Sequence, residues 1–232
     1  MKLDKSMSFR ATTLRQRLLG GLLLSLITSP VFGQVKDAPI VFANQDAIVT
    51  TLVQPVGLSS GGNQGSSSSF SNDSNQWLKV EFHFGVVPPP QKGNFVDEVE
   101  FKVWVEGRDL LDPAGQPGQG IAVGLTGSVT YVNLAKAKDT YGVFYVHPST
   151  LARYSTDRGG ANDFLRTFDV HVEAYVNGQL VDAVDKNKET DITWYQKLKA
   201  IPSLVFRQNQ CIFIAMDPGR YPAIKIPADA GK

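Results

Sequence analysis

The stretch that decides the fold is Phe164–Asp185, which reads FLRTFDVHVEAYVNGQLVDAVD. Apolar residues alternate with polar ones on both sides of Asn177-Gly178. This dipeptide favours a two-residue hairpin turn, because type I′ geometry needs positive φ at both central residues. The stretch therefore predicts a β-hairpin with one face in a core. The opposite face, which includes His171 and Glu173, is expected to be exposed to solvent.

The composition is that of a turn-rich globular protein. The 232 residues are 42% hydrophobic and 19% charged, with 21 Gly and 13 Pro. A formal net charge of +1 gives no basic field, so nucleic acid is not expected as a partner. Cys211 is the only cysteine, so no intrachain disulfide can form. It lies in an apolar run, where a small buried hydrophobic residue is expected rather than a reactive thiol.

Residues 1–33 have the pattern of a secretory signal peptide. Basic residues precede the apolar run Leu18–Ile27, which is about ten residues long and therefore shorter than the roughly 20 that a spanning helix needs. Pro30 breaks this run, and cleavage is expected after Gly33. The alternatives are an uncleaved anchor or a mitochondrial-type presequence. We expect an exported protein, periplasmic or extracellular, with no membrane span after cleavage.

Two short strands and a linker are expected next. Residues 34–56 contain Pro39–Ala43 and Ala47–Val53, which are rich in β-branched residues. Residues 57–76 are rich in Gly, Ser and Asn, a composition typical of a flexible linker or a long loop. Such a stretch can fold the two strands back onto their own domain or carry them to a neighbouring molecule.

Residues 77–217 are predicted to form a β-sandwich domain. Trp77–Val87 and Glu98–Glu106 alternate between apolar and polar residues, as half-buried strands do. Tyr141–Val146 is apolar on both faces, which is typical of a central strand. Pro148 favours a short helical turn after this strand, because proline fits the first position of a helix.

The remaining segments of this domain are less regular. Gly124 and Gly127 interrupt Ile121–Leu134, which predicts a bulge or bend. Glu189–Ile201 fits either a helix or a strand, and a short helix is favoured. The last strands are expected at Leu204–Phe206 and Gln210–Met216.

The fold class follows from the order of these segments. Residues 218–232 form a predicted C-terminal tail with little to bury. About eight to ten strands with no βαβ alternation predict an all-β fold, an antiparallel β-sandwich that is immunoglobulin-like in the broad sense, with one or two short helices. The paired cysteines of antibody-type domains are absent.

Catalytic and metal-binding patterns are not found in the sequence. His83 and His171 are expected on exposed strand faces, and His147 precedes a proline. A zinc site needs three or four converging ligands, which these positions do not suggest. No Gly-x-Ser-x-Gly elbow in a strand-to-helix context and no phosphate-binding loop occur. Acidic residues at alternate strand positions are interpreted as solubilising. No catalytic residue, cofactor or metal is therefore expected.

Aromatic residues are the only candidates for a contact site. Trp104 interrupts a charged strand face, Trp77 opens a strand, and Trp194 and Tyr195 lie between charged residues. An exposed tryptophan on a flat sheet can bind a sugar ring or anchor a protein partner. The alternative, which is favoured, is that a second layer such as the N-terminal strands or Glu189–Ile201 covers Trp104.

Several motifs carry a resemblance to a known group of proteins. They are WLKVEFHF at 77–84, FKVWVEG at 101–107 and VFYVHPSTLARY at 143–154. With the signal peptide and the Ser/Gly-rich stretch, these segments resemble small exported proteins found beside type IV pilus assembly components in Verrucomicrobia-type bacteria. The resemblance covers roughly residues 77–217. It implies an immunoglobulin-like fold and no enzymatic role, and it assigns no functional residue.

Three functions are compatible with the sequence. The first is a non-enzymatic exported β-sandwich that acts by protein–protein contact in the cell envelope, in pilus assembly according to the resemblance. Its partner would be an envelope protein or a second copy of the chain. The second is a carbohydrate-binding module that uses the tryptophans. An exported hydrolase ranks last, since it needs acids, or a nucleophile and a base, from distant strands.

Overall fold

The computed structural model describes residues 38–43, 45–55, 76–112, 114, 120–155, 169–187, 193–215, 217 and 219–226, all within the compact unit Gln34–Lys232. The predicted signal peptide, nearly all of the predicted linker and the first residues of the hairpin stretch, 164–168, lie outside these ranges. In the described part of the chain, no helix has the length and hydropathy that a membrane crossing requires.

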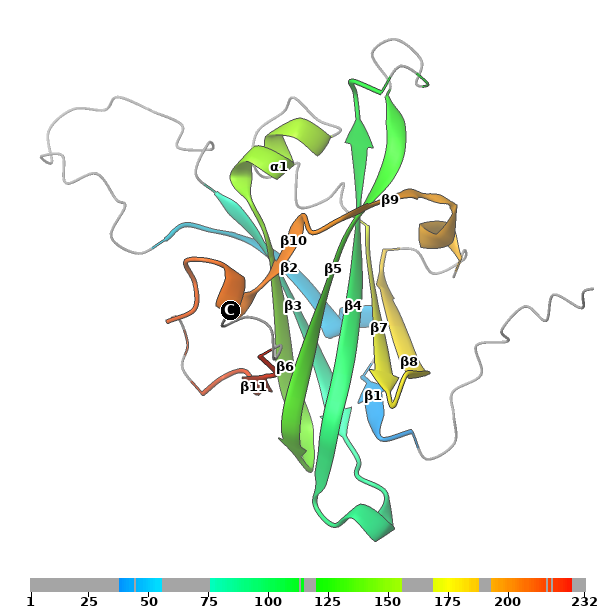
Figure 1. Ribbon diagram of the computed structural model, residues 1–232, viewed down its shortest axis with the longest axis vertical. Coiled ribbons are helices and arrows are strands. Elements are labelled where there is room, and N and C mark those ends of the chain that lie inside the picture. Colours follow the sequence, from blue (N-terminus) through cyan, green and yellow to red (C-terminus); the bar gives the residue numbers. More distant parts are fainter. Residues whose placement is uncertain are drawn as a thin grey trace, which may run out of the picture. The chain divides into compact units, whose positions relative to one another are not determined.

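Two β-sheets form the structure, which confirms the predicted all-β sandwich (Figure 1). The five-stranded sheet has the order β1-β3-β6-β10, and β2 also pairs with β3. Its strands are β1 (Ile40–Phe42), β2 (Ile48–Val53), β3 (Trp77–Val86), β6 (Ala137–Val146) and β10 (Val205–Arg207). All of its pairings are antiparallel. The predicted central strand, β6, is paired on both sides.

The six-stranded sheet has the order β11-β5-β4-β7-β8, and β9 also pairs with β5. Its strands are β4 (Phe95–Asp109), β5 (Ile121–Ala135), β7 (Val170–Val176), β8 (Gln179–Lys186), β9 (Lys199–Pro202) and β11 (Ala223–Ile224). Only the β5–β9 pair among these is parallel. The α-helix in the described residues, α1 (Pro148–Tyr154), begins at Pro148 as predicted.

The predicted hairpin is β7 and β8. Asn177 and Gly178 form its turn with φ of 52° and 76°, the two positive values that a type I′ turn requires. Val170, Val172 and Ala174 are buried in the core, as the alternation predicted. A register shift at Ala174/Tyr175 interrupts the ladder near the turn.

The core between the sheets is filled by the apolar faces of their strands. Phe82 and Phe84 of β3 pack against Phe101 of β4, with ring centroids 4.9 and 4.7 Å apart. Gly142 of β6 makes room for Phe82, because a Cβ there would lie 2.1 Å from the Phe82 Cζ atom. Buried aromatic pairs of this kind dominate core energetics, since each ring removes a large apolar area from water.

The N-terminal strands pair within their own chain. β1 lies along Phe84–Val86 of β3, and β2 lies along Trp77–Phe82 of the same strand. A further bond ties β1 to the hairpin, because the backbone N–H of Phe42 donates to the Asp182 carboxylate at 2.7 Å. Of the two arrangements that the sequence leaves open, the structure has the one within the same molecule.

Of the bulge or bend expected in Ile121–Leu134, no bulge is found at Gly124 or Gly127. β5 keeps a constant register with β4 from Phe95↔Ala135 to Asp109↔Ile121. Its glycines instead let neighbours approach closely. A Cβ on Gly127 would lie 2.3 Å from the Val205 carbonyl oxygen, and a Cβ on Gly124 would contact Leu198 and Trp104.

The strand predicted at Gln210–Met216 is also wrong. A 3-10 turn covers Gln208–Gln210, and turns follow through residue 215. Phe213 is only 1% exposed, whereas Ile212 and Ile214 are 55% and 62% exposed. Phe213 inserts between Trp77 and Tyr145, at ring-centroid distances of 5.4 and 4.6 Å. A turn satisfies this pattern because it buries one residue and exposes both neighbours without needing a partner strand.

Cys211 lies in this turn and is half-buried. Its Sγ donates to the Gln208 carbonyl oxygen at 3.3 Å, and burial raises the pKa of the thiol. A raised pKa disfavours the reactive thiolate, in agreement with the expectation that Cys211 is a packing residue and not a reactive thiol.

The C-terminal residues dock onto both sheets. β11 extends the six-stranded sheet by pairing with Tyr131 and Val132. On the other sheet, Arg220 and Tyr221 donate hydrogen bonds to Glu81, and Lys79 lies 2.8 Å from the same carboxylate. Burial raises the pKa of Glu81, but these three partners outweigh it and lower the pKa to about 2. The described part of the predicted tail is therefore fixed to the sandwich.

Candidate functional site

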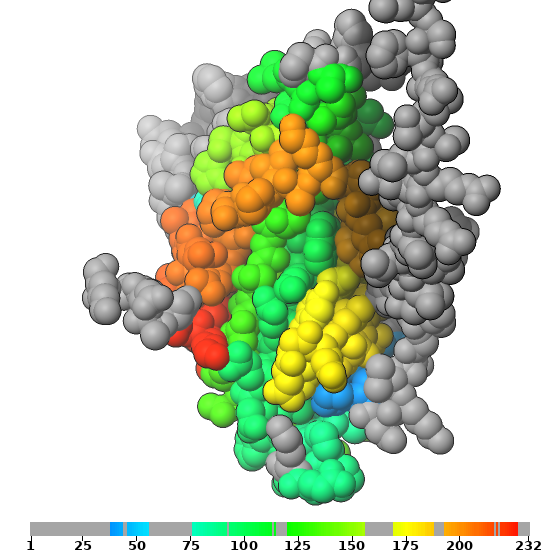
Figure 2. Space-filling model, turned by 45° about the vertical axis from the view of Figure 1, so that its right-hand side comes forward, coloured from blue at the N-terminus to red at the C-terminus, as the bar shows by residue number. Residues whose placement is uncertain are grey.

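The candidate site lies on the outer face of the six-stranded sheet. Polar and aromatic side chains of β4, β5, β7 and β8 project from this face, and the segment 193–207 crosses it (Figure 2, orange). In this segment, the 3-10 turn Trp194–Lys197 resolves the ambiguity of Glu189–Ile201, because β9 follows directly after it. The face divides into a polar cluster beneath this turn and a groove beside it.

The polar cluster consists of six side chains from β7, β8 and the 3-10 turn: His171, Glu173, Tyr175, Asp185, Trp194 and Tyr195. His171 and Glu173 are only 2% and 4% exposed, so the expectation that they face solvent is wrong. The physical reason is that Trp194 and Tyr195, which are themselves buried, cover this part of the sheet.

His171 is held from two sides. Its Nδ1 lies 2.8 Å from Oδ1 of Asp185, and that oxygen also accepts a hydrogen bond from Nε1 of Trp194 at 2.7 Å. The Tyr195 ring stacks on the imidazole, with a centroid distance of 3.7 Å and an interplanar angle of 15°. Because Asp185 lies on β8 while the stacking ring and the Trp194 bond come from the 3-10 turn, His171 and Asp185 together join the turn to the sheet.

Glu173 is the acceptor at the centre of the cluster. Tyr175 and Tyr195 each donate a hydroxyl to it at 2.6 Å, one to each carboxylate oxygen. His171 Nε2 lies 3.5 Å from Oε1 of Glu173, an ion-pair distance that is too long for a good hydrogen bond. A carboxylate is suited to this position, since it accepts from several donors at once.

The cluster changes the titration of its members. Burial lowers the pKa of His171, but the hydrogen bond to Asp185 and the negative charges of Asp185 and Glu173 outweigh it and raise the pKa above its usual value. Burial raises the pKa of Glu173, but the charge of His171 and the hydroxyls of Tyr175 and Tyr195 outweigh it and lower the pKa. The charged forms of His171 and Glu173 therefore stabilise each other.

A histidine bonded to an aspartate resembles a general base with its orienting acid. A base must reach the proton that it abstracts, however, and Nε2 of His171 is buried with no hydrogen-bond partner. The acid on the Nε2 side of the ring, Glu173, is occupied by two tyrosines. The arrangement is suited to fixing the Trp194–Lys197 turn in place. Among the described residues, no group of three or more metal-ligating side chains gathers.

The structure separates the four aromatic residues that the sequence singled out. Trp194 and Tyr195 are buried in the polar cluster. Trp77 is buried on the other sheet, where its ring packs against Phe213 and lies 4.5 Å from the ring of His147. Trp104 is half-buried: of the two segments expected to cover it, Glu189–Ile201 brings Tyr195 to 4.9 Å from its ring, and Trp104 still lines the groove. The four rings do not form one open face.

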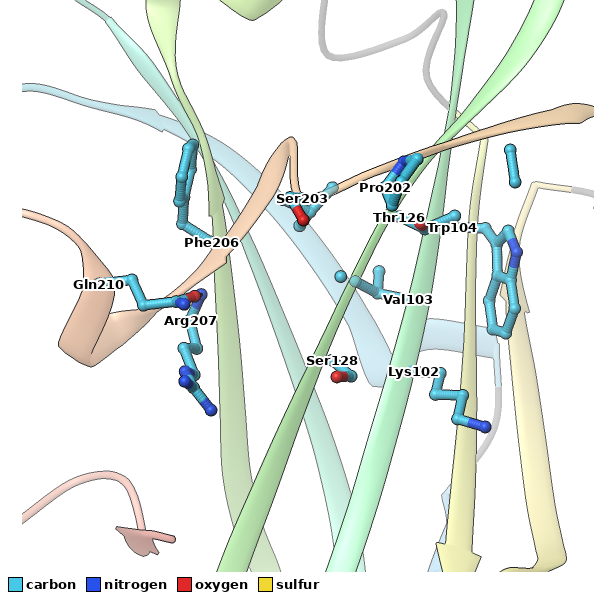
Figure 3. Close-up of a pocket in the computed structure, with 13 residues that line it drawn as sticks. Lys102, Val103, Trp104, Thr126, Ser128, Pro202, Ser203, Phe206, Arg207 and Gln210 are labelled. Atoms are coloured by element: carbon cyan, nitrogen blue, oxygen red, sulfur yellow. The ribbon is translucent and has the colours of Figure 1, made fainter. Parts of the chain in front are cut away.

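The groove begins beside Trp104 and has a volume of about 520 Å³ (Figure 3). Its floor is the outer face of β4 and β5, and one wall is the chain that runs from β9 through β10 to the following turn. It is lined by Lys102–Trp104, Thr126–Ser128, Ala200, Pro202, Ser203, Val205–Arg207 and Gln210. The groove joins two aromatic rings, several hydroxyl groups and two cationic side chains.

The edge of β5 is incompletely covered beside this groove. β9 pairs with Val123–Thr126, and β11 pairs with Tyr131 and Val132. The Lys225 backbone N–H extends the second pairing to the Thr130 carbonyl oxygen. Among the described strands, none pairs with residues 127–129 on this side. The groove thus contains a short gap in the edge of the sheet near Ser128, because the chain at Val205 already lies against Gly127.

Sequence reasoning did not find the groove. Arg207 and Ser128 carry no local signal, because a basic residue after a short strand and a serine on an exposed face are both common. The prediction that Glu189–Ile201 covers Trp104 was the one available sign that this face carries a second layer.

Comparison with known proteins agrees with the fold. Residues 53–227 match a protein-family model, so the match spans most of the chain. A crystal structure of a protein from Akkermansia muciniphila is similar, with a TM-score of 0.57 and 18% sequence identity over 81% of this chain and 93% of that chain. At this identity the likeness shows the fold alone. Akkermansia belongs to the Verrucomicrobia, the bacterial group to which the sequence resemblance points. No curated protein matches the chain.

Proposed function

The chain belongs to the protein family whose model spans residues 53–227, and we propose that it works by contact with another protein rather than by catalysis. The function proposed is that of a non-enzymatic β-sandwich that binds another protein in the cell envelope. The sequence resemblance implies no enzymatic role, which supports this reading. Export rests on the signal-peptide pattern of residues 1–33.

The observation that carries the proposal is the groove with its gap in the edge of β5. Exposed strand edges recognise extended peptides, because the backbone N–H and C=O groups there can pair with a further strand. Polar side chains around such an edge select the partner. The groove combines both features on one face.

Pilus assembly is the setting that the sequence resemblance suggests. This finer role rests on the motifs at 77–84, 101–107 and 143–154, and on the bacterial group of the similar structure. A second copy of the chain is the other partner expected from the sequence. Carbohydrate binding now depends on Trp104 alone, since the other tryptophans are buried.

Site-specific cross-linking in cells of the native host tests the proposal. A photo-reactive amino acid replaces Ser128, which is exposed in the groove. The matched control carries the same group at Gln179, which is exposed beside the hairpin turn. We expect adducts with one envelope protein at Ser128 and none at Gln179. Identification of pilus components in the adduct would support the finer role, and an absence of groove-specific adducts would contradict protein contact at this site.

A further inference from the structure

The charge of the groove is of one sign. Lys102 and Arg207 line it, and none of the lining residues is acidic. The other polar groups are the hydroxyls of Thr126, Ser128 and Ser203 and the side chain of Gln210. An anionic group in the groove would therefore meet two cations and several hydrogen-bond donors without a competing carboxylate in the lining.

Arg207 is the less engaged of the two cations. Within the described residues, no carboxylate forms an ion pair with it, and its Nε is buried without a hydrogen-bond partner. A carboxylate in the groove would bond instead to the terminal nitrogens of the guanidinium, which can donate paired, charge-assisted bonds. The neighbouring Gln210 accepts from the Arg207 backbone N–H at 3.3 Å, which leaves its own NH₂ group as a donor.

Lys102 is partly engaged. Its Nζ lies 4.1 Å from the centre of the Tyr175 ring and 3.9 Å from the exposed Glu100 carboxylate. These contacts hold the ammonium at the β7 side, while Arg207 lies on the β10 side, with Ser128 between the two (Figure 3). Lys102 therefore adds a positive field, and the specific contact falls to Arg207.

The shape of the site favours an extended backbone. Residues 127–129 lie between the pairings of β9 and β11, and the chain at Val205 already lies against Gly127, so an extended segment in the groove would meet the free edge of β5 near Ser128. Trp104 and Pro202 supply apolar surface on the opposite side of the groove from Arg207. An extended peptide presents side chains at alternate positions, so one acidic side chain can meet Arg207 while an apolar one meets Trp104.

We infer that the groove binds an extended segment of a partner protein in which an acidic side chain, paired with Arg207, alternates with apolar residues. The inference rests on the proposed function, since it names the partner chemistry of the same groove.

Titration calorimetry of the full chain at low salt tests the inference with two model peptides. These are acetyl-TVEVEVT-amide and its neutral counterpart acetyl-TVQVQVT-amide. We expect the acidic peptide to bind about tenfold more tightly, which corresponds to roughly 1.4 kcal/mol. Arg207→Gln is expected to abolish this preference. Arg207→Lys should retain part of it, because the charge remains without the paired donors.

Arg153→Gln is the matched control, because it removes the same charge from an exposed position on α1, outside the groove. It should leave the preference unchanged. Far-ultraviolet circular dichroism and thermal melting establish that each variant folds. If Arg207→Gln does not fold, the acidic-peptide preference is measured in Lys102→Gln, where a reduction of about threefold is expected for loss of one screened charge.

Equal binding of the two peptides, or binding of neither, would overturn the inference. So would an Arg207-dependent interaction with an acidic polysaccharide, such as alginate, in the absence of peptide binding. Cross-linking at Ser128 separates this failure from failure of the proposed function. A groove-specific protein adduct without acidic preference keeps the contact function and rejects the acidic segment. Loss of the adduct rejects the contact function itself.

Discussion

The substitution Glu173→Gln removes the central acceptor of the polar cluster while keeping the size of the side chain. Glu173 accepts two tyrosine hydroxyls at 2.6 Å and lies 3.5 Å from His171 Nε2. A glutamine retains one oxygen for one tyrosine, but it presents an NH₂ group to the second hydroxyl and no charge to the imidazole. Asp185 then remains as the only acid bonded to His171.

The magnitude follows from burial. Removing one partner of a buried ion pair typically costs about 3–5 kcal/mol of unfolding free energy, because the remaining charge stays uncompensated. The His171–Glu173 distance is long and Asp185 still compensates the histidine, so the lower limit of about 3 kcal/mol applies. For a domain of this size, that loss lowers the melting temperature by about 6–12 °C.

Urea unfolding followed by circular dichroism measures this change. The matched control is Glu100→Gln on the adjacent strand, where the side chain is 39% exposed and has only a 3.9 Å contact with Lys102. That variant should stay within about 0.5 kcal/mol of the native chain. A loss below about 1 kcal/mol for Glu173→Gln, or an equal loss in the control, would refute the idea that this carboxylate holds the turn in place.

Three further predictions concern pH, a close approach and a buried ring. Stability should be greatest between about pH 4.5 and 6.5. Charged His171 contributes its full stabilisation below 6.5, and this is lost as the pH rises through its raised folded-state pKa, whereas charged Glu173 contributes fully above 4.5, and this is lost as the pH falls through its lowered folded-state pKa. Urea midpoints that do not change from pH 4 to pH 8 would contradict this. Gly127→Ala should cost about 2 kcal/mol, since its Cβ would overlap the Val205 carbonyl, and a melting temperature equal to that of the native chain would disprove the close approach. Phe213→Ala should cost about 3–5 kcal/mol while the exposed Ile212→Ala stays within about 0.5 kcal/mol, and similar losses for the two variants would argue against the buried turn.

The hairpin could be predicted because its information is local. Asn177-Gly178 sets the turn, and the alternation on both sides sets the buried face. The same alternation misplaced His171 and Glu173. Their burial depends on Trp194 and Tyr195, about 20 positions later in the chain, and period-2 patterning describes a strand without regard to what covers its outer face.

The errors at the glycines and at Gln210–Met216 have a common cause. A glycine in a strand can mark a bulge or the close approach of another backbone, and only the path of β10 decides that Gly127 is the second case. An apolar run can pair as a strand or insert a single ring, and the gap between Trp77 and Tyr145 decides in favour of Phe213. Both decisions depend on residues far away in the sequence.

The groove could not be predicted for the same reason. Ser128 and Arg207 are distant in sequence, and they line one surface only because the chain leaves the six-stranded sheet at Pro202 and joins the five-stranded sheet at Val205. The tryptophans showed where aromatic residues are, but their exposure was decided by packing. Of these three, only Trp104 borders the groove.

The crossing between β9 and β10 has a mechanical consequence. Pro202 moves with one sheet and Val205 with the other, and Ser203 between them has a φ of 65°, a tight left-handed corner with little slack. The two sides of the groove are thus attached to different layers of the sandwich. Any sliding of one layer over the other would change the distance from Arg207 to Trp104. The width of the groove is therefore set by the packing between the two sheets, so substitutions deep in the core can alter which ligand the groove binds.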